Sequence, residues 1–291
     1  MTAPETLADA ISRVQSARWP QRLIALIGAA AIQAAFAVPA FALLGDENPF
    51  AWSTAIVGAF GAGFFLYWRH LAGADSAAER LLPHMLPMVA PDLRYTRHPT
   101  LECPLLDDCP APIGAVYTPQ DGLVGTYEGI PLTSMEIASF TEVRTGSDKR
   151  LAPLFRGIVV MVPASPDGDF LLAVGKSPPI KAEVLGGGPI TSHVFDMAGQ
   201  DRCIAQPDGL EPEPVVDRLK RLQGVLPKDV HLLAVRQTGG TARIALKMDR
   251  DPYGLGGVFT SRDTLGPLVN QTLGDLGLAP AVALVWAGTD E

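Results

Sequence analysis

The chain has 291 residues, of which 47% are hydrophobic and 19% are charged, and its formal net charge is −8. This length permits one large domain or two small ones, each with a hydrophobic core. The acidic balance argues against a nucleic-acid partner, because binding to phosphates needs a clustered basic face that the sequence lacks.

Residues 1–22 predict an amphipathic helix beside a membrane. Thr2 and Glu5 have the spacing of a capping box, in which each side chain bonds a backbone N–H of the other residue. The apolar residues that follow at helical spacing are Leu7, Ile11 and Val14. The segment is therefore predicted to lie at the membrane surface and to lead into the apolar sequence behind it.

Residues 23–68 predict a transmembrane helical hairpin. The run 23–44 has no charged side chain and spans roughly 33 Å as a helix, at about 1.5 Å per residue. The run 51–68 is also uncharged and spans roughly 27 Å. The link 45–50 is too short to do more than reverse the chain, so the two helices are predicted to be antiparallel neighbours.

The positions of the cations predict the orientation of this hairpin. Arginines flank it on both sides, whereas the link carries only two acids, Asp46 and Glu47. The flanking arginines are Arg13, Arg18, Arg22, Arg69 and Arg80. Because Lys and Arg concentrate on the cytoplasmic side of membrane proteins, both termini are predicted to be cytoplasmic and the link to face outward.

A cleaved signal peptide is an alternative interpretation of the first apolar run. Ala40, Phe41 and Ala42 match a small-x-small cleavage site, and three arginines precede the run. However, the run is long for the apolar core of a signal peptide, and so is the segment before it. Even after cleavage, the second run, with Arg69 and His70 behind it, would favour a cytoplasmic location for the rest of the chain.

Small side chains repeat every four residues along the second run. Thr54, Gly58 and Ala62 form one such row, of the kind on which membrane helices pack closely. The neighbouring row is Ala55, Ala59 and Gly63. Two uses are open: packing within the hairpin, or assembly into a homo-oligomer or with another membrane protein. Gln33 lies in the middle of the first run, where its amide needs a partner in the second helix or in a second protomer.

Residues 69–110 predict a helical, proline-rich connector. Ser76 and Glu79 form a second capping-box pattern. The prolines that are expected to break the following helix are Pro83, Pro87 and Pro91. His84 in this segment is predicted to be a half-buried core residue rather than a metal ligand.

The three cysteines, Cys103, Cys109 and Cys203, are too few and odd in number for a disulfide framework. The simpler interpretation is reduced thiols in a reducing compartment. A bridge between Cys103 and Cys109, or a metal site that also uses His98, is the alternative, although the spacing in HPTLECPLLDDC matches no zinc motif.

Residues 111–291 predict a cytoplasmic α+β domain. Short alternating segments from Tyr117 onward are typical of strands, and the stretches FRGIVVMVP and FLLAV are expected to form a hairpin across ASPDGD. The later predicted elements are a helix around 215–222, two strands joined by Thr-Gly-Gly at 238–240, a helix over 265–276 and a strand at 281–286. This order indicates an α+β rather than a regularly alternating α/β fold.

No catalytic, cofactor-binding or metal-ligating residue is predicted, and no cofactor. The GKS motif at Gly175 has Phe170 where a phosphate loop needs its first glycine. The stretch that resembles a calcium loop from Asp249 has Tyr253 and Thr260 where oxygen ligands are expected. The GLGG and GGG stretches lack the dinucleotide fingerprint, and the sequence contains neither H-E-x-x-H nor G-x-S-x-G.

Three stretches carry a resemblance to a known family: LLPHMLPMVAPDLRY, YTPQDGLVGTYEGIPLTSMEIASFTEV and LFRGIVVMVP. Their hydrophobic, glycine and aromatic pattern resembles the bacterial domain-of-unknown-function 3137 family, and the order of features from HVFDMAGQ to RIALKM is also similar. The resemblance covers most of residues 80–260. It implies a membrane hairpin with a cytoplasmic α+β region, and it implies no assigned reaction and no catalytic residues.

These patterns together predict a multi-pass protein of the bacterial inner membrane, with an α+β soluble domain preceded by a two-helix transmembrane hairpin. We expect it to be non-enzymatic and to bind a protein partner or small ligand through its cytoplasmic domain. The alternative is a membrane-anchored enzyme acting on an envelope or membrane metabolite, with Cys103, Cys109 or acids near the GGG stretch as reactive groups.

Overall fold

The computed structural model describes residues 6–97, 99, 109–114, 116–145, 148–174, 185, 188–197 and 199–288. The chain divides into two compact units, which we name the helical unit and the sheet unit. The helical unit comprises Met1–Met85 and Gly254–Leu273, and the sheet unit comprises Leu86–Tyr253 and Gly274–Glu291. Each unit therefore combines two segments that are far apart in the sequence.

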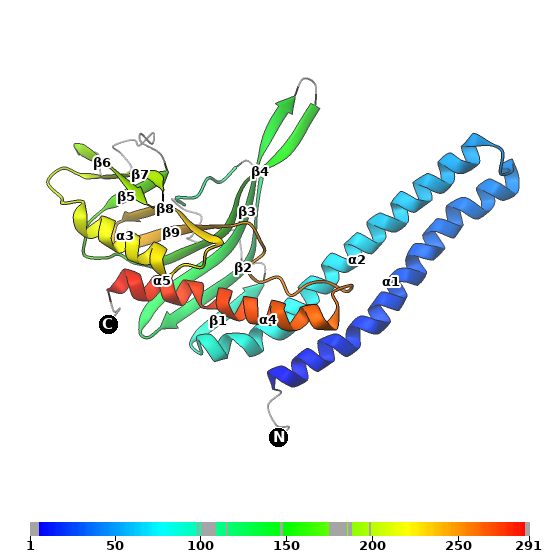
Figure 1. The fold of residues 1–291 in the computed structure, drawn as a ribbon, viewed down its shortest axis with the longest axis horizontal. Helices are drawn as coiled ribbons and strands as arrows, with labels where there is room; N and C mark the ends of the chain where they lie inside the picture. The colour runs from blue at the N-terminus through cyan, green and yellow to red at the C-terminus, as the bar shows by residue number, and fades with distance from the viewer. Residues whose placement is uncertain are drawn as a thin grey trace. The chain divides into compact units, whose positions relative to one another are not determined.

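Two long antiparallel helices form most of the helical unit (Figure 1). Helix α1 spans Leu7–Leu44 and helix α2 spans Pro49–Val89. Both are long and apolar enough to cross a membrane, so the predicted pair of apolar helices is confirmed to that extent. The predicted segments 1–22 and 23–68 meet inside α1, because this helix continues through Pro20 and across residues 22 and 23 without a break.

Helix α1 begins at a capping box that follows the predicted one. The hydroxyl of Thr6 accepts a hydrogen bond from the backbone N–H of Asp9 at 3.2 Å, and the Asp9 carboxylate accepts one from the backbone N–H of Thr6 at 3.3 Å. Thr2 and Glu5, the predicted pair, lie outside the described residues. The helix ends at Gly45, whose φ of 79° favours glycine.

The prediction that prolines break the helix behind the hairpin is wrong. Pro83 and Pro87 lie within α2, which continues to Val89, and Pro91 follows its end. The fully buried apolar residues around these prolines are Leu81, Leu82 and Met85. Burial of such side chains stabilises the helix by more than the loss of the proline hydrogen bonds destabilises it, so tertiary packing decides the conformation here.

Small residues allow α1 and α2 to approach each other closely. A Cβ atom added at Gly58 would lie 2.8 Å from the Cβ of Phe36. Gln33 donates from its side-chain amide to the backbone carbonyl of Ala55 at 3.2 Å, which is one of its two predicted partners. Gly58, the central member of the row Thr54, Gly58 and Ala62, is therefore used for packing within the hairpin.

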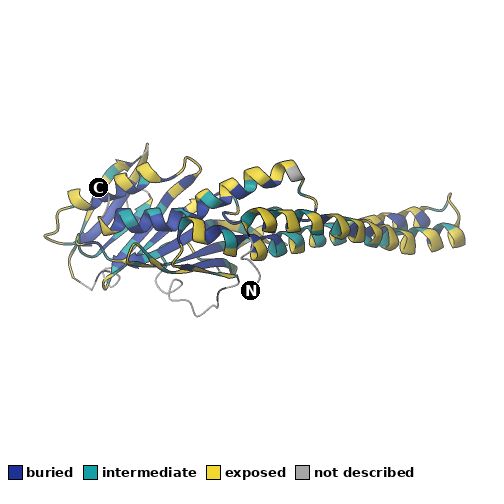
Figure 2. Cartoon of the chain, turned by 90° about the horizontal axis from the view of Figure 1, so that it is seen from below, coloured by how far each residue is buried: buried dark blue, intermediate teal, exposed yellow. Residues whose placement is uncertain are grey.

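Much of the outer surface of the hairpin is exposed (Figure 2), and many of the exposed side chains are large and apolar. Phe60 is 76% exposed and Phe64 is 72% exposed. The residues that line one apolar depression on this surface are Ile56, Ala59, Phe60, Gly63, Phe64 and Tyr67. A contiguous patch of large apolar side chains is unusual on a protein surrounded by water, and it indicates contact with an apolar partner or solvent.

We expect Gly58→Leu to destabilise the hairpin and Gly63→Leu to leave it intact. A leucine at position 58 would collide with Phe36, whereas no heavy atom lies within 4 Å of a Cβ added at Gly63. Overpacking of this kind typically costs about 1–3 kcal/mol. The measurement is the thermal unfolding midpoint of the full chain in detergent, and equal midpoints for the two variants would contradict the observed packing.

The sheet unit contains a nine-stranded sheet in the order β1-β2-β3-β4-β9-β8-β5-β7-β6, and every pair in it is antiparallel. With its helices, it confirms the α+β class. The strands are β1 Leu93–Arg97, β2 Val116–Tyr127, β3 Ile130–Thr145, β4 Asp148–Pro163, β5 Phe170–Val174, β6 Ile190–Met197, β7 Gln200–Pro207, β8 Val230–Thr238 and β9 Thr241–Met248. Its helices are α3 Glu213–Val225 and α5 Leu278–Ala287, whereas most of α4 Arg262–Leu276 belongs to the helical unit.

The two faces of this sheet are covered differently. Helix α5 packs on β3 and β4, and α3 packs on β8 and α5 (Figure 1). Trp286 of α5 is fully buried, contacts the ring of Phe170 and donates from its indole to the Gln237 side chain at 2.9 Å. On the opposite face, Ala111 packs against Ile137 and other buried residues of the strands. Buried apolar side chains therefore lie on both faces of the sheet.

Two predicted elements of the later chain are wrong. The stretches now seen as β4 and β5 do not pair with each other, because β4 pairs with β3 and β9 and β5 pairs with β7 and β8. Residues 281–286 form part of helix α5 instead of a strand. By contrast, the helices predicted around 215–222 and over 265–276 and the strand pair joined at 238–240 are confirmed as α3, α4 and β8–β9.

Candidate functional site

Two arginines of α1 hold a segment that lies much later in the chain. Arg18 and Arg22 each donate side-chain hydrogen bonds to backbone carbonyls of residues 255–260, which belong to the same helical unit. The acceptors are Leu255 and Gly256 for Arg18, at 3.0 and 3.1 Å, and Val258 and Thr260 for Arg22, at 2.7 and 2.5 Å. Because the two arginines are four residues apart, they project from the same side of the helix.

The same segment is fitted closely to α2. The ring of His70 stacks on Phe259 with centroids 5.9 Å apart, and its Nδ1 accepts the Phe259 N–H at 3.4 Å. A Cβ atom added at Gly257 would lie 2.1 Å from the His70 carbonyl oxygen. The GLGG stretch that contains Gly257 therefore has a packing role in this structure.

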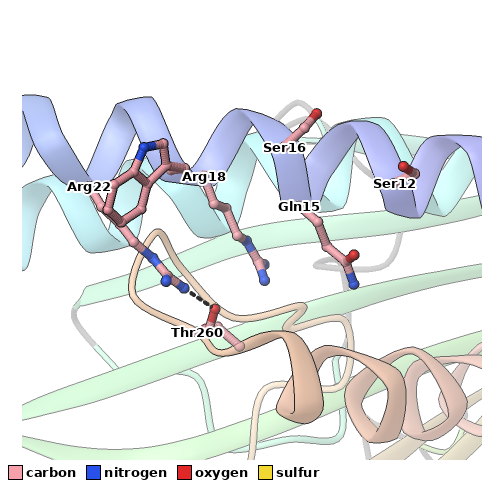
Figure 3. Close-up of a pocket in the computed structure, with 7 residues that line it drawn as sticks. Ser12, Gln15, Ser16, Arg18, Arg22 and Thr260 are labelled. Carbon is pink, nitrogen blue, oxygen red and sulfur yellow. Dashed lines mark hydrogen bonds between the residues drawn. The ribbon is translucent and has the colours of Figure 1, made fainter.

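A cavity of about 360 Å³ is formed by α1 and this segment (Figure 3). Its described lining residues are Ser12, Gln15, Ser16, Arg18, Trp19, Arg22 and Thr260. In Figure 3, Gln15 and Arg18 extend from α1 towards the segment, and Arg22 reaches Thr260. Two of these described residues are cations and none is an acid, so the cavity favours an anion.

Arg18 carries a positive charge that the described residues leave partly uncompensated. The residue is 5% exposed, and its Nε and Nη1 atoms have no hydrogen-bond acceptor in the described part of the chain. Burial, together with the charge of Arg22, lowers the pKa of Arg18, but a guanidinium remains protonated at neutral pH. Because a buried cation is costly without a counter-charge, an anion in the cavity would stabilise Arg18.

A second group of charged side chains lies on one face of the sheet. Arg97 of β1 donates from Nη1 to both carboxylate oxygens of Asp121, each at 2.6 Å. The hydroxyl of Tyr95 donates to the same carboxylate. This arrangement joins two neighbouring strands, since Arg97 and Asp121 are directly opposite in the β1–β2 register.

Glu136 of β3 is the least satisfied member of this group. It is fully buried, and neither carboxyl oxygen has a hydrogen-bond partner among the residues that the structure describes. Arg156 approaches Oε1 at 3.6 Å, and it approaches Asp251 at the same distance. Burial, reinforced by the charges of Asp251 and Asp121, raises the pKa of Glu136 to about 9. The carboxyl group is therefore protonated at neutral pH.

Neither cluster is predicted from the sequence as a site. Arg18 and Arg22 stand out only as signals of orientation, and their i, i+4 spacing is the one local sign that they share a partner. Their acceptors lie 236 to 238 residues later, which no local pattern can indicate. For Glu136, the available signal is an acid among the apolar residues of a strand.

Of the motifs singled out in the sequence, some lie outside the described residues and others have a structural role. The GKS motif at Gly175, with His98 and Cys103, lies outside the described residues. Asp251 of the stretch that resembles a calcium loop accepts the backbone N–H of Tyr253 at 3.0 Å, as in a turn. In the described part of the chain, no three His, Cys, Asp or Glu residues are placed to hold a metal ion.

Comparisons with protein-family models, with curated proteins and with solved structures find no match to this chain. The resemblance to the domain-of-unknown-function 3137 family therefore rests on the quoted stretches alone. No activity is carried over to this chain from a relative, and the function has to follow from its own residues.

Proposed function

We propose that the chain is an integral protein of a bacterial inner membrane and that α1 and α2 form its two-helix transmembrane hairpin. The observation that carries this proposal is uncharged length combined with exposed apolar side chains. Residues 23–44 and 51–68 contain no charged group, and Phe60 and Phe64 face outward. Hydrocarbon accommodates such a surface, whereas water does not. The family resemblance supports the same arrangement.

Both termini are cytoplasmic in this proposal. The first span is preceded by Arg18 and Arg22, and the second is followed by Arg69. The link between the spans carries the acid Asp46 instead. Trp52 donates from its indole to the backbone carbonyl of Asp46 at 2.8 Å. Tryptophan is enriched at membrane interfaces, so this residue suits the outer surface of the bilayer.

A third segment, Asp263–Ala287, has the length and composition of a span, but the proposal leaves it outside the membrane. In its most apolar window 56% of the residues are buried within the protein, compared with 17% for α1 and for α2. Trp286 is fully buried, and Asp275 forms an ion pair with Arg250. Because the protein already buries these side chains, this segment does not need lipid around it.

The proposed activity is binding rather than catalysis. The cavity beside Arg18 and Arg22 offers charged donors to a small ligand. A protein partner or a second copy of the chain would meet the hairpin on the exposed residues Ala59 and Gly63, since Gly58 packs against the first helix. In either case, whether a small ligand or a protein partner binds, the hairpin anchors the soluble region to the membrane.

Reporter fusions test this topology. A phosphatase that folds only outside the cytoplasm is expected to be active when fused after Glu47 and inactive when fused after Gly288. A fluorescent protein that matures only in the cytoplasm should give the opposite pattern. Phosphatase activity at Gly288 would overturn the orientation, and release of the full chain from membranes by alkaline carbonate would overturn the spanning hairpin.

A membrane-anchored enzyme acting on an envelope or membrane metabolite is the second candidate. Glu136 favours it, because a buried acid with a raised pKa can transfer protons near neutral pH. Cys109 does not, because burial raises the pKa of its thiol and disfavours the reactive thiolate. In a turnover screen with membrane metabolites, activity that is lost in Glu136→Gln would support this candidate, and activity that persists would exclude Glu136.

A further inference from the structure

We propose that the cavity lined by Arg18 and Arg22 binds the phosphate group of an anionic ligand, and that this ligand is the headgroup of an anionic phospholipid. The binding of phosphate follows from the geometry of the cavity. The lipid source rests in addition on the proposed membrane hairpin.

The donors in the cavity match the chemistry of a phosphate. Arg18 lines the cavity with a buried guanidinium whose Nε and Nη1 have no acceptor in the described part of the chain and are closed to solvent, so it acts on a ligand through its charge. A guanidinium stays charged at neutral pH, so a phosphate in the cavity is attracted to it even without a direct hydrogen bond. Arg22 adds a second charge, and the side-chain amide of Gln15 points into the same space (Figure 3). A phosphate would thus neutralise a charge that is otherwise buried alone.

The position of the cavity along α1 selects the source of this phosphate. Arg22 directly precedes the uncharged run 23–44. At about 1.5 Å per residue, Arg18 and Arg22 lie within roughly 8 Å of the start of this run. The headgroup layer on each side of a bilayer is roughly 5–8 Å thick. Trp19, which also lines the cavity, is 69% exposed and belongs to a residue type that is enriched at this depth.

The test compares phosphate carriers on the full chain in maltoside detergent. The thermal unfolding midpoint is measured while phosphatidylglycerol, phosphatidylcholine, sodium phosphate or sodium chloride is added, with the two salts at equal ionic strength. A ligand that binds only the folded protein raises the midpoint as its concentration passes its Kd. We expect phosphatidylglycerol to raise the midpoint, and phosphatidylcholine and sodium chloride to have no such effect.

Three variants assign the effect to the cavity. Arg18→Gln removes the charge. Gln15→Glu keeps both arginines and places a carboxylate one turn before Arg18, where it competes with the ligand. Arg13→Gln is the matched control, because Arg13 lies on the same helix but lines a different cavity with Glu79. The first two variants should bind phosphatidylglycerol roughly tenfold or more weakly, and the control should bind it as the unchanged protein does.

Each outcome has a defined meaning. Midpoint shifts with phosphatidylglycerol that disappear in Arg18→Gln and Gln15→Glu support the proposal. Shifts with sodium phosphate but not with phosphatidylglycerol overturn the lipid source and assign the cavity to a soluble phosphate compound. The absence of any shift, or equal shifts in all variants, overturns the site. If this occurs while the reporter fusions still indicate a spanning hairpin, the proposed function stands and only the ligand is wrong.

Discussion

At pH 8, Glu136→Gln is expected to be more stable than the unchanged protein by several kcal/mol. Burial, reinforced by Asp251 and Asp121, raises the pKa of Glu136 to about 9, whereas an exposed glutamate has a pKa of about 4.3. Between these values the unfolded chain releases the proton and the folded protein retains it. The free energy of unfolding therefore falls as pH rises from about 4.3 to about 9, at about 1.4 kcal/mol for each pH unit.

The measurement is urea unfolding of the full chain in detergent between pH 5 and pH 9. The groups whose charges act on Glu136 are Asp251, Asp121, Arg156 and Arg97. The gap between the variant and the unchanged protein should widen with pH, because glutamine has no proton to release. Glu142→Gln is the control: Glu142 is exposed and pairs with Lys149 at 3.5 Å, so its loss should change stability by less than about 1 kcal/mol.

The opposite result would show that Glu136 is ionised in the folded protein. If Glu136 and Arg156 formed a working ion pair at their separation of 3.6 Å, removing one charge would leave the other unpaired. The variant would then be less stable than the unchanged protein at pH 8, and its deficit would grow from low to neutral pH.

Elements whose signals are local could be predicted from the sequence. The two apolar helices follow from uninterrupted uncharged runs, and α3 follows from apolar residues at helical spacing. In the β8–β9 pair, Gly239 and Gly240 have φ of 59° and 78°, and a two-residue hairpin turn of type I′ needs positive φ at both positions. The Thr-Gly-Gly sequence therefore contains the information that defines this turn.

Elements that depend on distant partners could not be predicted. Residues 281–286 are a short apolar run, and Val282, Ala283 and Trp286 are all fully buried. Because all six residues of this run are apolar, the sequence has no periodicity to separate helix from strand. Strand β4 likewise pairs with β9, with Gly157 opposite Lys247, and neither sequence contains a sign of the other.

The candidate site also depends on partners that are distant in the sequence, so it could not be predicted. Its cations are visible in the sequence, but the carbonyl groups that orient them are supplied by backbone, which carries no residue-type signal. That Arg18 keeps two nitrogen atoms without an acceptor depends on the conformation of residues 255–260. Only the three-dimensional structure shows that these arginines, which the sequence offers as signals of orientation, also face a cavity.

Arg218→Met is expected to destabilise the sheet unit by about 3–5 kcal/mol, the cost of removing one partner of a buried ion pair. Arg218 of α3 is 7% exposed and donates from Nε to Asp167 at 2.7 Å. From Nη1 it donates to the carbonyls of Val285 and Trp286, at 3.1 and 2.8 Å. Because the last carbonyls of a helix lack the donors of a further turn, Arg218 supplements the Gly288 N–H, which also bonds Val285, at the end of α5.

The measurement is again urea unfolding of the full chain in detergent, with the exposed neighbour Lys220→Met as a control that removes the same charge from α3. The double variant Arg218→Met with Asp167→Leu should recover part of the lost stability, because it removes the buried carboxylate that the single variant leaves unpaired. Without such recovery, the main contribution of Arg218 would be its hydrogen bonds to the end of α5. Equal stability of Arg218→Met and Lys220→Met would contradict both contributions and show that α5 is held on the sheet by its apolar side chains alone.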